Sequence, residues 1–202
     1  MGRCIDLLPV YYEGPAYLKQ KPPAGGGRNL IVVLGPNAYE QRANDANANR
    51  PAAMKRARKQ YPEARFKAGH ILNCDLGGIG TVDHNLTILT ASANTAMTKY
   101  DNALKRAAQI LKKVYEEIYK QYPDANEALL QSIKYGIKLN IVISQPWGSS
   151  LPDNCIFKKI KYYVKEWDGI PTGRQGGNVQ RLIAYIRKCI NACNGQEVKN
   201  EL

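Results

Sequence analysis

The sequence predicts an α+β fold, because two kinds of apolar pattern occupy separate segments of the chain. Short runs rich in β-branched residues, at 29–34 (NLIVVL) and 138–144 (KLNIVIS), are typical of buried strands. Longer segments, from Ser92 to Pro123 and from Val179 to Cys193, repeat apolar residues at helical spacing. The 202 residues suffice for one domain with a sizeable core.

Local signals place the elements in order along the chain. Residues 1–29, rich in Pro, Gly and Tyr, indicate a flexible arm, and residues 30–202 indicate a single domain. After the strand at 29–34 we expect a helix over 38–60, broken by Pro51, with its second half at 52–60. Two short strands joined by a glycine-rich loop follow within 61–93, the second at 84–89. The remaining expected elements are a long helix capped by Ser92 or Asn94, a helix at 126–135, a strand at 138–144 and a closing helix at 179–193. Residues 155–167 are expected to form a strand, with a short helix as the alternative.

The charge balance indicates a polyanionic partner. Lys and Arg number 29 against 17 Asp and Glu, which gives a formal net charge of +12. Such an excess attracts nucleic acid, whose phosphates supply most of its non-specific affinity. No basic helix with a bulky apolar face lies near either end, so a membrane partner is not expected.

Cysteine content and targeting signals bound the setting. Five cysteines, with no CxxC pair, argue against a complete disulfide framework and against a structural zinc site, so we expect reduced, mostly packed cysteines. No segment is apolar enough for a membrane span or a secretory signal. The protein therefore acts where it is made, or is a piece of something larger that is exported.

The most specific stretch runs from Ala68 to Asp101 (AGHILNCDLGGIGTVDHNLTILTASANTAMTKYD). A His follows a Gly at the end of a short strand, a loop and a second strand come next, and an Asn then lies on the first turn of a long helix. This order is the layout of a ββα-metal site, and it places that core at about residues 64–122. Asn94 and Asp101 are seven residues apart, so both project from one face of the helix.

These residue types suit phosphodiester hydrolysis. A neutral imidazole, that of His70, can take a proton from water near neutral pH. Mg²⁺ prefers oxygen ligands and keeps several waters, so the amide oxygen of Asn94 with few helpers can hold it. Asp101 can then hold a metal-bound water or orient Asn94.

The run GHILN…LGGIG…NLTILTASAN…D resembles the DNA/RNA non-specific endonuclease family of the His-Me finger superfamily, in the form found as toxin domains of bacterial secretion systems. The resemblance covers roughly a sixth of the chain. It implies His70 as general base, Asn94 as the ligand of Mg²⁺ or another divalent cation such as Mn²⁺, and Asp101 as the accompanying acid. It also implies cleavage with little sequence preference, DNA favoured over RNA, and a delivered effector that acts in a target-cell cytoplasm. An exported toxin with a basic surface would need an acidic immunity protein in its producer.

The chain departs from the family pattern at two places. The archetype has Asp-Arg-Gly-His, whereas Lys67-Ala68-Gly69-His70 stands here, with Arg65 close by. The second acid is usually Glu, and here it is Asp101. The side chains expected to hold nucleic acid are Lys55, Arg56, Arg58, Lys59, Arg65 and Lys67.

Other polar residues have structural interpretations. Asn85 is expected to hydrogen-bond the loop backbone, and Asp75 to form a turn or serve as a spare metal ligand. His84, the rival base, is expected to be structural or to contact substrate. The basic run at 158–165 is interleaved with Tyr162, Tyr163 and Trp167, which either belong to the core or stack on bases.

Two alternative functions stay open. The first is a basic nucleic-acid-binding module without turnover. The second is a toxin of different chemistry, a transferase or a metal-free RNase acting through His84 and tyrosines. Activity that persists in chelator would point to the second.

Overall fold

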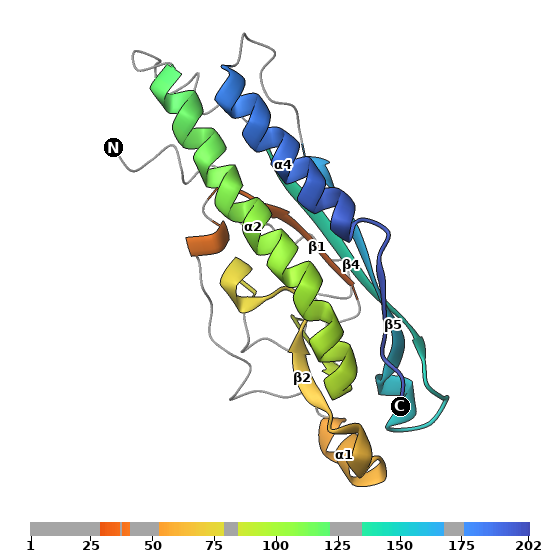
Figure 1. Ribbon diagram of the computed structural model, residues 1–202. Coiled ribbons are helices and arrows are strands. Elements are labelled where there is room, and N and C mark those ends of the chain that lie inside the picture. Colours follow the sequence, from red (N-terminus) through yellow and green to blue (C-terminus); the bar gives the residue numbers. More distant parts are fainter. Residues whose placement is uncertain (1–28, 37, 41–52, 79–84, 122–134, 168–175) are drawn as a thin grey trace.

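A computed structural model describes residues 29–36, 38–40, 53–78, 85–121, 135–167 and 176–202, and it confirms the α+β class (Figure 1). The strands are β1 (Asn29–Leu34), β2 (Lys67–His70), β3 (Leu86–Leu89), β4 (Gly136–Pro146), β5 (Phe157–Trp167) and β6 (Glu197–Lys199). The helices are α1 (Met54–Gln60), α2 (Ala91–Gln121) and α4 (Gly177–Cys193), with short 3-10 helices at Ala38–Glu40, Pro62–Ala64, Cys74–Leu76 and Asp153–Cys155.

The larger sheet is antiparallel, with strand order β1-β4-β5-β6. Burial alternates along β4 and β5, so one face of the sheet is apolar. The strands predicted at 29–34, 138–144 and 155–167 are confirmed as β1, β4 and β5. The sequence analysis missed β6, which has only three residues and one buried side chain, Val198.

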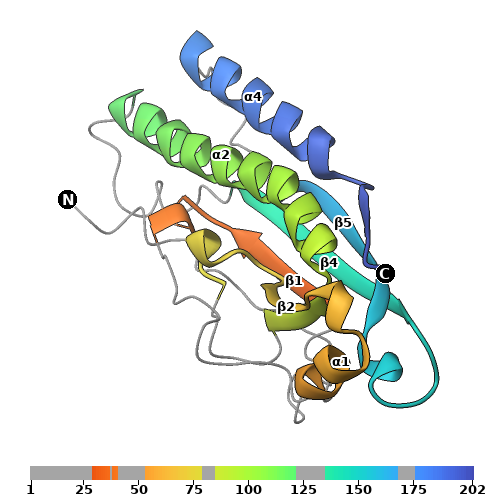
Figure 2. The same cartoon turned by 60° about the horizontal axis from the view of Figure 1, so that its bottom comes forward.

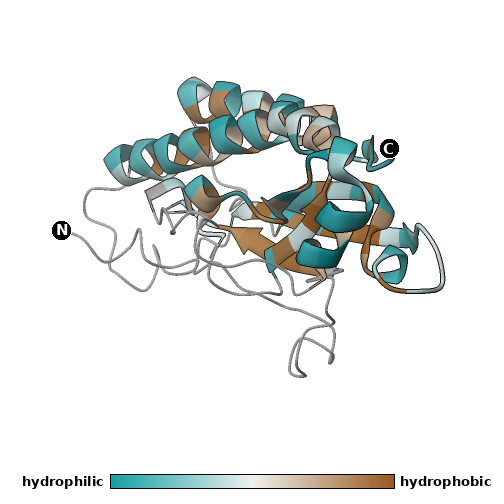
Figure 3. Ribbon diagram, turned by 90° about the horizontal axis from the view of Figure 1, so that it is seen from below, coloured by the Kyte–Doolittle hydropathy of each residue, from teal (hydrophilic) through white to brown (hydrophobic). Residues whose placement is uncertain are grey.

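Helices α2 and α4 lie side by side across the apolar face of this sheet (Figures 1 and 3). The main core lies between these layers and contains most buried residues of both helices together with the inward side chains of β1, β4 and β5. The predicted long helix and closing helix are thus confirmed. The predicted cap was wrong: α2 starts at Ala91, and the Thr90 hydroxyl accepts the bond from the Ala93 amide at 3.2 Å.

The smaller sheet is the antiparallel pair β2–β3, and α2 follows β3 after one residue. Figure 2 shows α1 beside β2, at the end of the molecule where α2 begins. A second apolar cluster joins them, built on Met54, Ala57, Phe66, Ile88 and Ile156. Helix α1 confirms the second half of the predicted broken helix.

Asn200 joins the two sheets. Its buried side chain accepts a hydrogen bond from the Thr90 amide at 2.8 Å and donates to the carbonyl oxygens of Ile88 and Phe157 at 3.0 and 2.8 Å. One amide therefore holds the end of β3, the start of α2 and the first residue of β5 together.

Several predictions lie outside the described residues: the arm up to residue 28, the part of the broken helix at 41–52, His84, and the helix at 126–135 except for its last residue. Tyr135 is described and is not helical. Among the described helices, none is long and apolar enough to cross a membrane.

Candidate functional site

His70 ends β2, where it pairs with Leu86 of β3, and its side chain is half-buried. The fully buried Asn85 fixes the backbone that follows: its side chain accepts from the Leu72 amide at 2.9 Å and donates to the Leu72 carbonyl at 3.1 Å. The Ile71 amide also donates to the Asn85 carbonyl at 2.8 Å. The predicted backbone role of Asn85 is thus confirmed, and it holds the segment that leaves His70.

Gly69 brings β2 against the first turn of α2. A Cβ atom at this position would lie 2.0 Å from Cδ1 of Leu89 and 3.3 Å from Oδ1 of Asn94. The Asn94 amide oxygen therefore lies against the backbone that carries His70, a closeness that a larger residue at position 69 would oppose. Asn94 itself is exposed.

His70 and Gly69 face opposite sides of the β2–β3 pair, because successive strand residues point to opposite faces. Gly69 faces α2, where Asn94 lies. His70 shares its face with Ala68, which packs against the second apolar cluster. The structure therefore places Asn94 on the Gly69 side of β2 and His70 on the opposite side.

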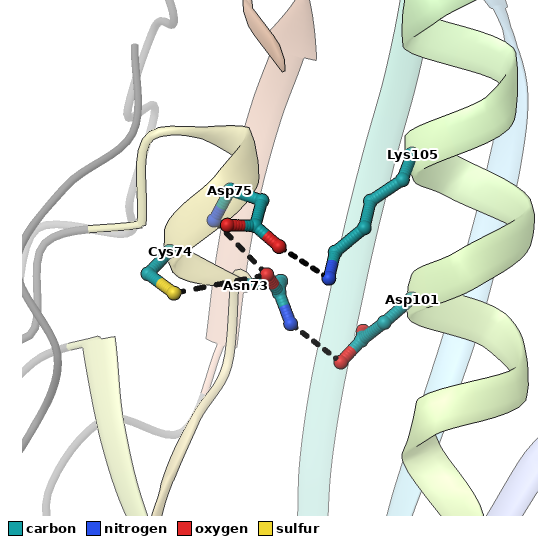
Figure 4. Close-up of polar contacts among 5 residues, drawn as sticks. All are labelled: Asn73, Cys74, Asp75, Asp101 and Lys105. Atoms are coloured by element: carbon teal, nitrogen blue, oxygen red, sulfur yellow. Dashed lines mark hydrogen bonds and ion pairs between the residues drawn. The ribbon is translucent and has the colours of Figure 1, made fainter. Parts of the chain in front are cut away.

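Asp101 lies further along α2, opposite the turn that follows β2 (Figure 4). Its Oδ2 accepts a hydrogen bond from the side-chain amide of Asn73 at 3.0 Å. Asn73 in turn caps the short helix Cys74–Leu76 by accepting from the Asp75 amide at 3.0 Å. Asp75 forms an ion pair with Lys105, one turn beyond Asp101. The turn expected of Asp75 is thereby confirmed, and its carboxylate is paired with Lys105.

The pKa of Asp101 is raised from 3.8 to about 6. Burial is the main cause, since it disfavours the charged carboxylate, and nearby Asp75 adds to it. The Asn73 hydrogen bond and Lys105 act in the opposite direction. Asp101 therefore exchanges its proton closer to neutrality than an ordinary aspartate.

The expected nucleic-acid-binding residues gather on α1 and the segment that enters β2. The exposed ones are Lys55, Arg56, Lys59, Arg65 and Lys67. Arg58 differs, because its half-buried guanidinium donates to the Phe66 carbonyl through Nε at 3.2 Å and Nη2 at 2.7 Å. Arg58 thus ties α1 to the chain entering β2.

Cysteines and clustered metal ligands add no further site in the described part of the chain. Cys74, Cys155, Cys189 and Cys193 form no disulfide among the described residues, in line with the reduced cysteines that the sequence indicated. Within the described ranges, no three His, Cys, Asp or Glu side chains gather as a metal site. The expected site is of another kind, since it depends on the amide oxygen of Asn94.

One cavity was not foreseen from the sequence. It has a volume of about 280 Å³ and is lined by Tyr61, Trp147, Asp153, Lys158, Glu201 and Leu202. The Tyr61 hydroxyl donates to Asp153 at 3.0 Å, and its ring meets that of Trp147 edge-on at 5.5 Å. These residues come from segments that are far apart in the sequence and share no motif. The aromatic content of residues 61–66 and Trp147 was the one sequence feature that pointed to the cavity.

Neither family models, nor curated proteins, nor solved structures match this chain. The site geometry and the sequence pattern therefore carry the functional argument.

Proposed function

We propose that the chain is a metal-dependent endonuclease, in which β2, β3 and α2 form the ββα-metal core of a His-Me finger nuclease. The observation that carries the proposal is that the Asn94 amide oxygen lies close to Gly69, the residue that precedes His70. It supports a site in which residues that follow one another in the sequence motif also lie close together in space.

In this proposal His70 is the general base, which accepts a proton from the attacking water. In-line attack at phosphorus puts the attacking and leaving oxygens on opposite sides. Both oxygens bond to one phosphorus, so the proposal requires His70 and Asn94 to reach the same phosphate at the end of β2, where His70 is the last residue.

Asn94 would hold the divalent ion, Mg²⁺ or Mn²⁺. The glycine at position 69 fits this role, because it leaves the amide oxygen close to the strand without a side chain between them. When bound, the ion would neutralise charge on the scissile phosphate. Asp101 is the proposed acid of the site, and its contact with Asn73 also positions the turn after His70.

The basic surface supports a nucleic-acid substrate. Lys55, Arg56, Lys59, Arg65 and Lys67 are exposed around the start of β2 and would hold phosphates on both sides of the cleaved bond. Contacts to phosphate carry no base information, so we propose cleavage with little sequence preference. The resemblance favours DNA over RNA and a delivered bacterial toxin or effector, whose immunity protein would be acidic.

The test is incubation of the full chain with plasmid DNA and with total RNA, each with Mg²⁺ and with EDTA. Asn94→Ala is the site variant and Asn178→Ala, an exposed asparagine on α4, is the matched control. We expect cleavage that needs Mg²⁺, that Asn94→Ala reduces by roughly a hundred-fold or more, and that Asn178→Ala leaves unchanged. Cleavage that persists in EDTA would contradict the metal mechanism. Salt-sensitive binding without cleavage would favour the alternative of a nucleic-acid-binding module without turnover.

A further inference from the structure

The larger sheet has a second face, turned away from α2 and α4, and this face is basic. Alternation along the strands brings Lys138 of β4, Lys159, Lys161 and Lys165 of β5, and Lys199 of β6 onto it. We call these five lysines, together with Tyr163, the basic strip. One acidic side chain shares the face: Glu197 pairs with Lys159 at 3.5 Å.

The register places like charges directly opposite each other. Lys138 pairs with Lys165 across β4 and β5, and Lys159 pairs with Lys199 across β5 and β6. Such pairs destabilise a sheet. A ligand with regularly spaced negative charges would offset this repulsion at both ends of the strip.

Tyr163 lies between the two lysine pairs and is 44% exposed, which is unusual for a large aromatic in a central strand. Its neighbour Tyr162 is fully buried in the core, so the two tyrosines have different roles. The ammonium of Lys161 lies 5.2 Å from the centre of the Tyr163 ring. An exposed aromatic ring with a cation beside it is the arrangement on which unpaired bases stack while their phosphates are neutralised.

We infer that the basic strip binds a single strand of nucleic acid, with its phosphates on the lysines and a base stacked on Tyr163. This rests on the proposed function in taking nucleic acid as the partner. The strip prefers an unpaired strand because a duplex keeps its bases stacked on each other, out of reach of a tyrosine on a sheet. The strip is tied to the proposed site, since Asn200 bonds to the Lys158 and Phe157 carbonyls as well as to the Ile88 carbonyl of β3.

The experiment measures the affinity of the full chain for a fluorescein-labelled oligothymidine and for the same strand in a duplex, by anisotropy in EDTA. Tyr163→Ala should weaken binding of the single strand roughly ten-fold and change duplex binding little. Tyr163→Phe, which keeps the ring, should bind as the parent does. Equal affinity of Tyr163→Ala and the parent for the single strand would overturn the inference.

Charge is tested by Lys161→Glu with Lys165→Glu, against Lys113→Glu with Lys188→Glu, two exposed lysines on α2 and α4. The strip pair should lose far more affinity for the single strand than the helix pair, although both change the net charge equally. Equal losses of affinity in the two double variants would overturn the strip as a nucleic-acid surface. The same conclusion would follow if the strip pair lost affinity for polyglutamate as strongly as for the single strand. If the parent cleaved neither DNA nor RNA with Mg²⁺ but Tyr163→Ala still weakened binding of the single strand, only the nuclease proposal would be rejected.

Discussion

Asp101 lies where burial opposes its ionisation, yet its carboxyl is hydrogen-bonded to the turn that follows His70. A folded pKa of about 6 against the ordinary 3.8 means that the folded chain holds this proton more tightly than the unfolded chain. Protonated Asp101 stabilises the fold fully at pH values below its ordinary pKa of 3.8, and this stabilisation is lost as the pH rises through the folded pKa of about 6. At neutral pH Asp101 therefore lowers the free energy of unfolding.

Asp101→Asn should remove this cost. We expect the variant to be more stable than the parent by about 1 kcal/mol at pH near 7, with the advantage shrinking toward pH near 4. Urea denaturation at the two pH values measures it. A stability difference that is the same at both would contradict the role of ionisation.

Tyr162 carries a buried hydroxyl that has no hydrogen-bond partner among the described residues. Tyr162→Phe removes this unsatisfied group and should raise the free energy of unfolding by about 1 kcal/mol. The matched control is Tyr115→Phe, since the Tyr115 hydroxyl donates to the Tyr135 carbonyl at 2.7 Å and accepts from its amide at 3.0 Å. Thermal or urea unfolding should show the control destabilised; a similar loss in both variants would refute the prediction.

At the scale of elements, the periodicity of apolar residues predicted the type of the long strands and helices. The apolar alternation of β4 and β5 and the helical repeat of α2 and α4 are long enough to determine the element type. Three-residue β6 carries too few positions for a pattern. Thr90, Ser92 and Asn94 are all capping residue types, so the sequence alone cannot choose among them, and the backbone geometry selects Thr90.

Contacts between distant residues were beyond prediction for a different reason. Asn200 meets Thr90 across 110 positions, and nothing in its local sequence marks it as a joint. The proximity of Asn94 to Gly69 was easier to expect, because the two residues belong to one short motif in which a loop and the second predicted strand separate them along the chain. Motif spacing thus predicted that β2 and the start of α2 lie close together, while the cavity at Tyr61 and Trp147 depends on the whole fold.

Asn200→Ala should separate the two sheets. The variant loses three buried side-chain hydrogen bonds and leaves the Thr90 amide and two carbonyls unsatisfied, so we expect a loss of about 3 kcal/mol in the free energy of unfolding. Hydrogen exchange should quicken at the start of α2. The control Asn194→Ala, which removes one hydrogen bond to the Val164 amide, should lower the free energy of unfolding by about 1 kcal/mol. An equal loss in both variants would contradict the role of Asn200 in connecting the two sheets.

Gly69→Ala should disturb the packing of β2 on α2. The added methyl would overlap Leu89, so we expect a loss of about 1–3 kcal/mol and weaker binding of Mn²⁺, measured by calorimetry. Gly177→Ala is the control, since a Cβ there meets nothing within 4 Å. Unchanged stability and unchanged Mn²⁺ binding in Gly69→Ala would contradict the close approach.

At the scale of the whole molecule, the basic side chains proposed to hold nucleic acid lie in two regions joined by Asn200: the surface of α1 and β2, and the basic strip of the larger sheet. With a net charge of +12, the chain attracts polyanions over its whole surface, so bulk charge explains affinity and not chemistry. The proposed chemistry depends on His70, and its role as base is the central claim.

The most direct test is chemical rescue of His70→Ala by imidazole during Mg²⁺-dependent cleavage, with His84→Ala, the other histidine of the chain, as control. We expect His70→Ala to lose at least a hundred-fold in rate, to keep its fold by circular dichroism, and to regain rate as imidazole is added. His84→Ala should keep most of its activity. Near-parental cleavage by His70→Ala, or rescue of His84→Ala instead, would contradict the assignment of the base.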